Sequence, residues 1–334
     1  MKRRSGSSRS GTSVEDLHRL LAYHRALLQD GTRNRAFRAA LARRVRPGAD
    51  VLDIGAGTGV WAVTAARLGA RHVVAVEKEP LLLPLIEAAA RENGVGDRVV
   101  TVCGDSRRLR LSRRFDVVVS ETIGNEAFDE DVVPILEDAR RRFLKPGGTL
   151  IPSEVSLMAA PARVGRKRLP AGIALRWAFF GSLAVHFPCS PGAGLRLLGR
   201  PAVLARADLM RADLGRSESG AKAEGRGLAA RFRVRDRGAV DGFAVWPEAE
   251  LAPGVRLETL RGTAWRPRLY PTEPLPAGAG EVSFRLFLEP PDRRWEVGHR
   301  GGIGVYSPLF AFGALRPRLQ GLKARSKRAR TRSR

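Results

Sequence analysis

The chain has 334 residues, enough for about two domains of ~150 residues each. Hydrophobic residues make up 43% and charged residues 28%, which is typical of a globular protein and excludes a disordered or collagen-like one. Lys and Arg outnumber Asp and Glu by 59 to 34, and only seven of the 59 are Lys. Two cysteines cannot build a disulfide framework, and no Cys/His cluster has zinc-ligand spacing. Charge interrupts the longest apolar stretch, around 169–187, so we expect no membrane partner. We also expect a cytoplasmic protein with no metal site.

Both ends of the chain are strongly basic. Residues 1–10 carry four basic side chains and no acid, and residues 316–334 carry nine and no acid. Such segments are typical of solvated, disordered tails, which we predict over 1–12 and 315–334. Their charge favours contact with nucleic acid or the ribosome, whereas the alternative is an Arg-rich composition with solubilising ends.

The first half of the chain alternates between helical and strand-like patterns. Apolar residues recur at helical spacing over 14–46. Short apolar runs then predict strands at 51–55, 72–77, 99–104, 115–121 and 149–154. Between these runs, the Ala-rich segments 61–70 and 80–93 predict helices. Cys103, in the third run, is expected to be a small core residue. The alternation predicts a Rossmann-like parallel sheet covered by helices, in a domain over 13–151.

The second half, over 152–314, lacks helical periodicity. Strand-like segments separated by Gly and Pro turns lie at 155–164, 227–236, 241–251 and 281–290. The predicted fold class is therefore an α/β Rossmann-like sheet followed by an all-β, barrel-like domain.

A glycine-rich turn, Asp53 to Gly59, follows the first strand and precedes a helix. Gly55, Gly57 and Gly59 let the backbone turn tightly and approach a ligand closely. The third glycine comes one place earlier than in the dinucleotide pattern G-x-G-x-x-G. Asp53 would repel a pyrophosphate and suits a cofactor with an ammonium group better.

Two further strands also end in acidic residues. Glu77 closes the second strand, where a carboxylate can bind both hydroxyls of a ribose. Asp105 and Ser106 follow the third strand and could bind an adenine amino group. With the glycine turn, these residues predict a site for S-adenosylmethionine. There are two alternatives to this prediction: the site binds NAD, or the glycines only allow the turn and bind no ligand.

Glu121 ends the fourth strand, and Glu130 follows nine residues later after a turn that contains glycine. Two converging carboxylates repel each other unless a cation joins them, and a planar guanidinium is the matching cation. We therefore predict that Glu121 and Glu130 bind a guanidinium. The alternatives are an acidic surface loop, or Glu126 or Asp129 in the place of Glu130.

These segments resemble the protein arginine methyltransferases over most of residues 20–300. The similar segments are 24–33, 51–59, 75–77, 121–130, 144–154, 242–246 and 263–265, the last with Ala264 where the family has histidine. The resemblance implies methyl transfer from S-adenosylmethionine to a guanidino nitrogen of arginine in a protein, with Glu121 and Glu130 as catalytic residues. It also implies that Arg33 binds the methionine carboxylate of the cofactor, and that the chain forms a homodimer through an arm at 170–190.

Two other functions stay open on the same fold. One is an RNA- or ribosome-directed methyltransferase whose basic ends supply affinity. The other is a polyanion-binding protein that no longer catalyses a reaction. The identity of the substrate and the degree of methylation stay open as well.

Overall fold

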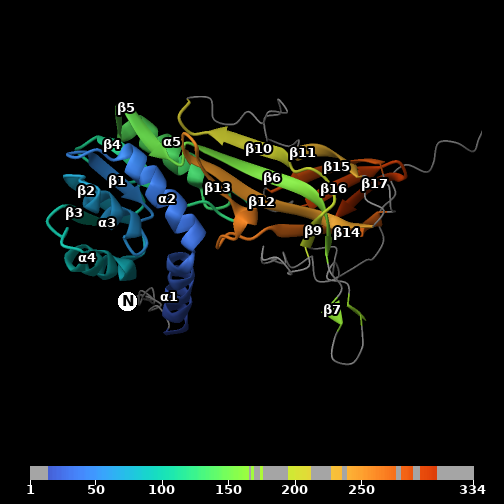
Figure 1. The fold of residues 1–334 in the computed structure, drawn as a ribbon, viewed down its shortest axis with the longest axis horizontal. Coiled ribbons are helices and arrows are strands. Elements are labelled where there is room, and N and C mark those ends of the chain that lie inside the picture. Colours follow the sequence, from blue (N-terminus) through green and yellow to red (C-terminus); the bar gives the residue numbers. More distant parts are fainter. Residues whose placement is uncertain are drawn as a thin grey trace, which may run out of the picture.

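The computed structural model describes residues 14–164, 167–168, 174–175, 195–211, 227–234, 239–275, 280–288 and 294–306. Figure 1 shows two halves: helices around a parallel sheet, from blue to green, and antiparallel strands, from light green to red. Both predicted basic tails lie outside the described residues, as does nearly all of the predicted arm at 170–190.

The first sheet has five parallel strands in the order β3-β2-β1-β4-β5. The strands are β1 (Asp50–Ile54), β2 (His72–Glu77), β3 (Val99–Cys103), β4 (Phe115–Ser120) and β5 (Leu144–Ile151). Every residue of the central strand β1 is buried, because strands flank it on both sides and helices cover the sheet. The predicted parallel sheet is confirmed, and β1 to β4 lie where the apolar runs placed them. The fifth strand was predicted over 149–154, whereas β5 begins at Leu144 and ends at Ile151.

The helices of this half are α1 (Val14–Gln29), α2 (Gly31–Arg44), α3 (Val60–Arg67), α4 (Leu83–Glu92), with the short 3-10 helix η1 (Pro80–Leu82) before it, and α5 (Val132–Arg142). Asp30 separates α1 from α2 and caps α2, because its carboxylate accepts the backbone N–H of Arg33 at 2.8 Å. None of the residues of α1 is buried, and Figure 1 shows α1 projecting from the body of the molecule.

The second half consists of β-strands, as predicted, and these strands pair antiparallel. They are β6 (Glu154–Val164), β7 (Lys167–Arg168), β8 (Ala174–Leu175), β9 (Leu195–Leu197), β10 (Ala202–Asp208), β11 (Leu228–Val234), β12 (Val240–Ala252), β13 (Val255–Glu258), β14 (Arg268–Leu275), β15 (Gly280–Phe287), β16 (Arg294–His299) and β17 (Gly302–Tyr306), with a 3-10 turn η3 (Thr259–Arg261). A six-stranded sheet around β6 and β12 faces a four-stranded sheet, β11-β15-β16-β17. Phe243 of the first stacks on Phe284 of the second with ring centroids 4.5 Å apart, so these rings join the two sheets.

The two halves share one hydrophobic core. A single cluster of buried side chains includes Val118 and Leu150 of the parallel sheet as well as Val155 and Leu251 of the antiparallel one. At the junction, Arg43 Nη1 of α2 donates to the carbonyl oxygen of Pro253, at 2.6 Å. Since α2 contacts β12 and β13, it holds the two halves together.

The prediction for Cys103 is wrong, because this residue is exposed. It ends β3, which is an edge strand paired on one side only, with β2. An apolar run cannot tell an edge strand from a central one. No helix in the described part of the chain combines the length and the apolar character that a bilayer crossing requires.

Candidate active site

The carboxyl edge of the parallel sheet gathers the predicted acidic residues. Asp53 lies in β1, Glu77 ends β2, Asp105 follows β3 and Glu121 follows β4. Because β1, β2, β3 and β4 are neighbours and run parallel, the residues that end them meet at one edge. Ligands of open α/β sheets bind beyond this edge.

The glycine turn lies beneath α1. Gly57 has a φ of +57°, and a Cβ atom there would come within 2.9 Å of His24 Cε1. A side chain at this position would therefore be strained and would press on α1. Burial and the charge of Arg33 lower the pKa of His24, so neutral imidazole is favoured above the turn.

Asp53 and Glu77 are both buried and both bind backbone N–H groups. Asp53 Oδ2 accepts from Ala62 N at 2.9 Å, whereas Asp53 Oδ1 is buried with no partner among the described residues. Glu77 Oε2 accepts from Gly57 N at 2.8 Å and Oε1 from Glu79 N at 2.9 Å. Burial raises the pKa of Asp53 to about 7, and the charge of Glu77 adds to this shift.

Asp105 and Ser106 lie at the same edge. The Asp105 carboxylate forms an ion pair with Arg107 at 3.2 Å, and this bond lowers the Asp105 pKa. The Ser106 side chain is buried, and its carbonyl oxygen accepts from Arg142 Nη2 at 2.8 Å. Their predicted contact with an adenine amino group stays a prediction.

Arg33 is buried and binds Glu121. Its Nη1 donates to Glu121 Oε2, and its Nη2 donates to the carbonyl oxygen of Leu27 at 2.9 Å. Arg33 Nε is buried with no partner in the described part of the chain. The guanidinium also lies over the Trp61 ring, 5.6 Å from its centroid. One N–H of Arg33 is therefore left for a further acceptor.

Glu121 lies between several charged groups. Its side chain is 8% exposed, and burial raises its pKa to about 7. The charge of Glu130 raises this pKa further, while Arg33 and a hydrogen bond from the Trp265 side chain lower it. The carboxylate thus takes up a proton close to neutral pH.

Glu130 and Tyr23 are exposed residues that interact electrostatically with Glu121. Glu130 is exposed, yet its charge acts on both Glu121 and Tyr23. Partial burial and the charge of Asp129 raise the pKa of Glu130. Burial and the two glutamates raise the pKa of Tyr23, so its hydroxyl stays protonated. The structure therefore brings Glu121, Glu130 and Tyr23 within electrostatic reach of one another.

Glu126, the alternative to Glu130, is bound by two side chains of β14. It is 1% exposed and accepts hydrogen bonds from the Tyr270 hydroxyl and, at 3.0 Å, from Arg268 Nη1. Asp129 Oδ1 accepts the Glu126 N–H at 2.9 Å. These contacts tie the segment between Glu121 and Glu130 to β14.

Two residues of this site were missed as functional candidates in the sequence. Tyr23 directly precedes His24, the first residue of segment 24–33, which resembles the family. The helical pattern of α1 could have placed both residues beside the glycine turn. Trp265 was noted only as part of segment 263–265, which resembles the family, although its side chain binds Glu121. No local pattern marks that contact.

Comparison with known proteins agrees with this geometry. Residues 51–148 match a family described as "Methyltransferase domain". The "Arginine N(omega)-methyltransferase" of Streptomyces achromogenes subsp. streptozoticus is 30% identical over 280 residues, which are 79% of this chain and 75% of that protein. The chain belongs to the protein arginine N-methyltransferase family.

Other family members match a shorter stretch. "Probable protein arginine N-methyltransferase 6.1" of Oryza sativa subsp. indica is 34% identical over 143 residues, 42% of this chain and 38% of the plant protein. The chain thus matches well under half the length of this relative.

Solved structures of the family share the fold of this chain. The "Trypanosoma brucei PRMT1 enzyme-prozyme heterotetrameric complex with AdoHcy" has a TM-score of 0.66 at 20% identity, over 88% of this chain and 95% of that one. Protein arginine methyltransferase 10 of Arabidopsis thaliana has a TM-score of 0.65 at 19% identity, over 86% and 94%. The predicted order, a Rossmann-like sheet followed by a β domain, is confirmed.

Proposed function

We propose that this protein transfers a methyl group from S-adenosylmethionine to a guanidino nitrogen of arginine in a protein. One observation carries the proposal. The buried carboxylate of Glu121 already binds a guanidinium, that of Arg33, and the charge of Glu130 reaches the same place. A carboxylate that binds one guanidinium, with a second negative charge close by, is suited to bind another guanidinium from a substrate.

The residues at the carboxyl edge fit the cofactor. Asp53 Oδ1 and Arg33 Nε are both buried without a partner among the described residues, and they offer an acceptor and a donor. An amino group and a carboxylate, as on the methionine part of the cofactor, would satisfy them. Glu77 would bind the ribose, Asp105 and Ser106 would bind the adenine, and the turn that contains Gly55, Gly57 and Gly59 would lie beside the cofactor.

When bound, S-adenosylmethionine supplies an electrophilic methyl group on a sulfonium. Glu121 and Glu130 hold the acceptor guanidinium and draw its positive charge toward the nitrogens that they contact. The remaining nitrogen is then the better nucleophile. Much of the acceleration comes from holding the two reactants in place. Because its pKa is about 7, Glu121 can take the proton that the acceptor nitrogen gives up.

Replacing Glu121 by glutamine tests this function. E121Q keeps an acceptor oxygen for Arg33 Nη1 but removes the charge that holds the acceptor. We expect turnover to fall by at least ~100-fold, as when one charge-stabilising group is lost, with little change in affinity for S-adenosylhomocysteine. Transfer of a labelled methyl group to arginine peptides measures the first quantity, and calorimetry measures the second.

The exposed Glu137 of α5 provides the control, since E137Q makes the same chemical change on the surface. We expect E137Q to match the wild type in both measurements. Near-normal turnover of E121Q would contradict the mechanism. Methylation of lysine peptides or RNA in place of arginine peptides would contradict the proposed acceptor.

Free arginine is a second candidate substrate. The relative from Streptomyces achromogenes, which matches 79% of this chain, is named for arginine and not for a protein. Competition between free arginine and an arginine peptide of equal concentration distinguishes the two acceptors. The preferred one inhibits methylation of the other more strongly.

We propose that the chain assembles into a homodimer. The trypanosome relative in the solved structure belongs to a heterotetrameric complex, and such assemblies support an oligomer here. The arm at 170–190 and nucleic-acid contact through the basic tails stay predictions, as does the cytoplasmic location.

A further inference from the structure

The amino edge of the parallel sheet, opposite the candidate active site, carries a row of basic side chains. Each strand starts beside at least one of them; in the spatial order of the sheet they are Arg98 at β3, Arg71 at β2, Arg46 before β1, Arg113 and Arg114 at β4, and Lys145 in β5. Parallel strands bring these residues to one edge for the same reason that they bring the acids to the other. Four gaps between strands make this edge about 19 Å long.

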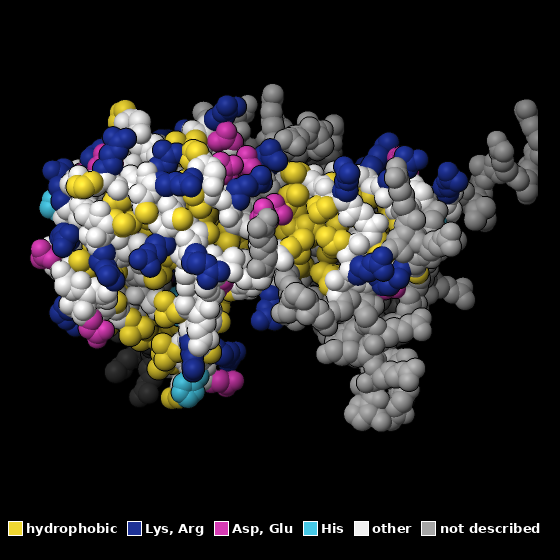
Figure 2. Space-filling model, viewed as in Figure 1, with side chains coloured by type: hydrophobic (Ala, Val, Ile, Leu, Met, Phe, Trp, Pro, Cys, Tyr) yellow, Lys and Arg dark blue, Asp and Glu magenta, His cyan; other side chains and the backbone are white. Residues whose placement is uncertain are grey.

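Acidic residues neutralise only part of this row. Buried Asp50 pairs with Arg71 at 3.1 Å, with Arg113 at 3.4 Å and with Lys145 at 2.8 Å. Asp116 pairs with Lys145 at 2.9 Å, and Asp97 lies 3.9 Å from Arg98. The side chain of Arg71 is nonetheless 59% exposed. Figure 2 shows many more Lys and Arg than Asp and Glu side chains on the visible face of this half. The six basic residues of the row outnumber the acids that pair with them, Asp50, Asp97 and Asp116, so the edge carries a net positive charge.

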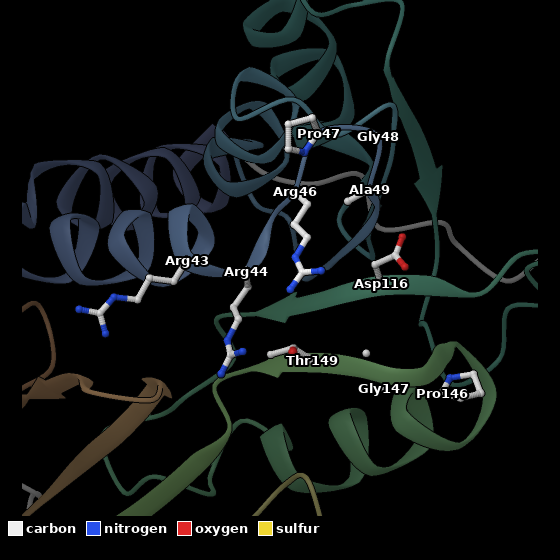
Figure 3. Close-up of a pocket in the computed structure, with 11 residues that line it drawn as sticks. Arg43, Arg44, Arg46, Pro47, Gly48, Ala49, Asp116, Pro146, Gly147 and Thr149 are labelled. Atoms are coloured by element: carbon white, nitrogen blue, oxygen red, sulfur yellow. The ribbon is translucent and has the colours of Figure 1, made fainter.

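A pocket of about 360 Å³ opens at the β1-β4-β5 end of this edge. The sheet register jumps from Phe115–Leu144 to Val117–Thr149, so residues 145–148 leave the ladder. Of these, Pro146, Gly147 and Gly148 form one wall of the pocket. Figure 3 shows Arg44 and Arg46 extending toward β4 and β5, whereas Arg43 points away from them.

Arg44 and Arg46 are the cations that the fold leaves available. Neither forms an ion pair or a side-chain hydrogen bond within the described residues. Asp116, the acid in the pocket wall, is already bound by Lys145 and by Asp50 N. Two guanidinium groups beside an open pocket favour a ligand with phosphate or carboxylate groups.

We propose that the amino edge is a second binding site, which takes the phosphate groups of a single-stranded nucleic acid. The row of cations runs along five strands, so it matches a chain of several phosphates better than one isolated anion. The pocket around Arg44 and Arg46 would hold one phosphate with part of its sugar. Because no aromatic residue is among those that line the pocket, the contact reads phosphates and not base sequence.

Fluorescence anisotropy with a labelled oligouridylate of about 15 nucleotides tests this site on the full chain. The variant R44A/R46A removes the two available cations. The matched control R233A/R300A removes two exposed Arg side chains from the second half, so that the net charge of the two variants is equal. Both variants keep the basic tails, so a difference between them reports the edge itself.

We expect R44A/R46A to bind the oligonucleotide several-fold more weakly than the control. The slope of log affinity against log salt should fall by about 1.4, since each contact with a single strand contributes about 0.7. Equal affinity and equal slope in the two variants would overturn the proposal. An oligoglutamate that competes as well as unlabelled oligouridylate would overturn the choice of ligand.

Two measurements keep the test independent of folding and of the active site. Both variants should melt at the wild-type temperature, and if R44A/R46A does not, the single exposed substitution R46Q repeats the comparison. Methylation of a short arginine peptide should not change in R44A/R46A. Since RNA binding is read without turnover, a failure of the proposed enzyme activity leaves this result interpretable.

Discussion

At the scale of single residues, the protonation of Glu121 controls the candidate site. Burial and the charge of Glu130 favour the protonated form, and Arg33 and Trp265 favour the carboxylate. A protonated Glu121 is a poor partner for a guanidinium, because the attraction between opposite charges is lost.

This balance predicts how the reaction depends on pH. Because the Glu121 pKa is raised to about 7, kcat/KM for an arginine peptide should rise as the pH increases through about 7 and then level off. The profile of kcat/KM between about pH 5.5 and pH 9 measures this limb. Constant kcat/KM down to pH 5.5 would show that Glu121 is ionised throughout and would contradict the assignment.

The backbone conformation of Gly57 supports a second prediction, on cofactor affinity. Its φ is +57°, and His24 Cε1 lies 2.9 Å from the position that a Cβ atom would take, so G57A should strain the turn and displace α1. We expect affinity for S-adenosylhomocysteine to fall by at least ~10-fold, which corresponds to about 1.4 kcal/mol, in a calorimetric titration.

Gly94 supplies the matched control. Its φ is +68°, and a Cβ atom there would have no neighbour within 4 Å. G94A should therefore bring a similar backbone strain without changing cofactor affinity. If G57A and G94A bind the cofactor equally well, the turn does not line the site.

At the scale of elements, the buried cluster of Glu126, Arg268 and Tyr270 joins the β4–α5 segment to β14. The Glu126 side chain is 1% exposed and that of Arg268 is 16% exposed, so the ion pair is largely removed from water. Since Glu130 follows Glu126 by four residues, this attachment positions the loop that carries Glu130.

Breaking the pair from one side should destabilise the protein strongly. R268M leaves Glu126 buried without its cation, which costs about 3–5 kcal/mol. The double variant E126M/R268M replaces both charges by apolar groups and should recover most of that loss. Urea unfolding measures both variants. A double variant that is as unstable as R268M would show that the unpaired charge of Glu126 does not cause the loss of stability.

At the scale of the whole molecule, the parallel and antiparallel halves depend on each other. They share one buried cluster. Two hydrogen bonds also cross the junction beside the site: Ala264 N–H donates to the Asp30 carboxylate, and Arg266 N–H donates to Asn125 Oδ1. Two halves that share a core lose stability together when either one opens.

We therefore predict a single unfolding transition. Scanning calorimetry of the full chain should show one peak, with calorimetric and van't Hoff enthalpies in agreement. The Trp61 and Trp295 environments, which lie in different halves, should change at the same temperature. Two resolved peaks would show that each half folds on its own and that the shared core contributes little.

The sequence by itself determined the elements and the chemistry of the carboxyl edge. Apolar runs that alternate with Ala-rich segments specify strands and helices locally, and parallel strands must bring Asp53, Glu77 and Glu121 to one edge. These inferences need only short-range patterns and one rule of topology.

Only the tertiary structure decided which groups touch. Arg33 and Glu121 are 88 residues apart, and Arg268 and Glu126 are 142 apart, so no local pattern could pair them. The exposure of Cys103 depends on β3 being the edge strand. Such contacts arise from the packing of distant segments, because burial and charge are set by neighbours that lie far apart in the sequence.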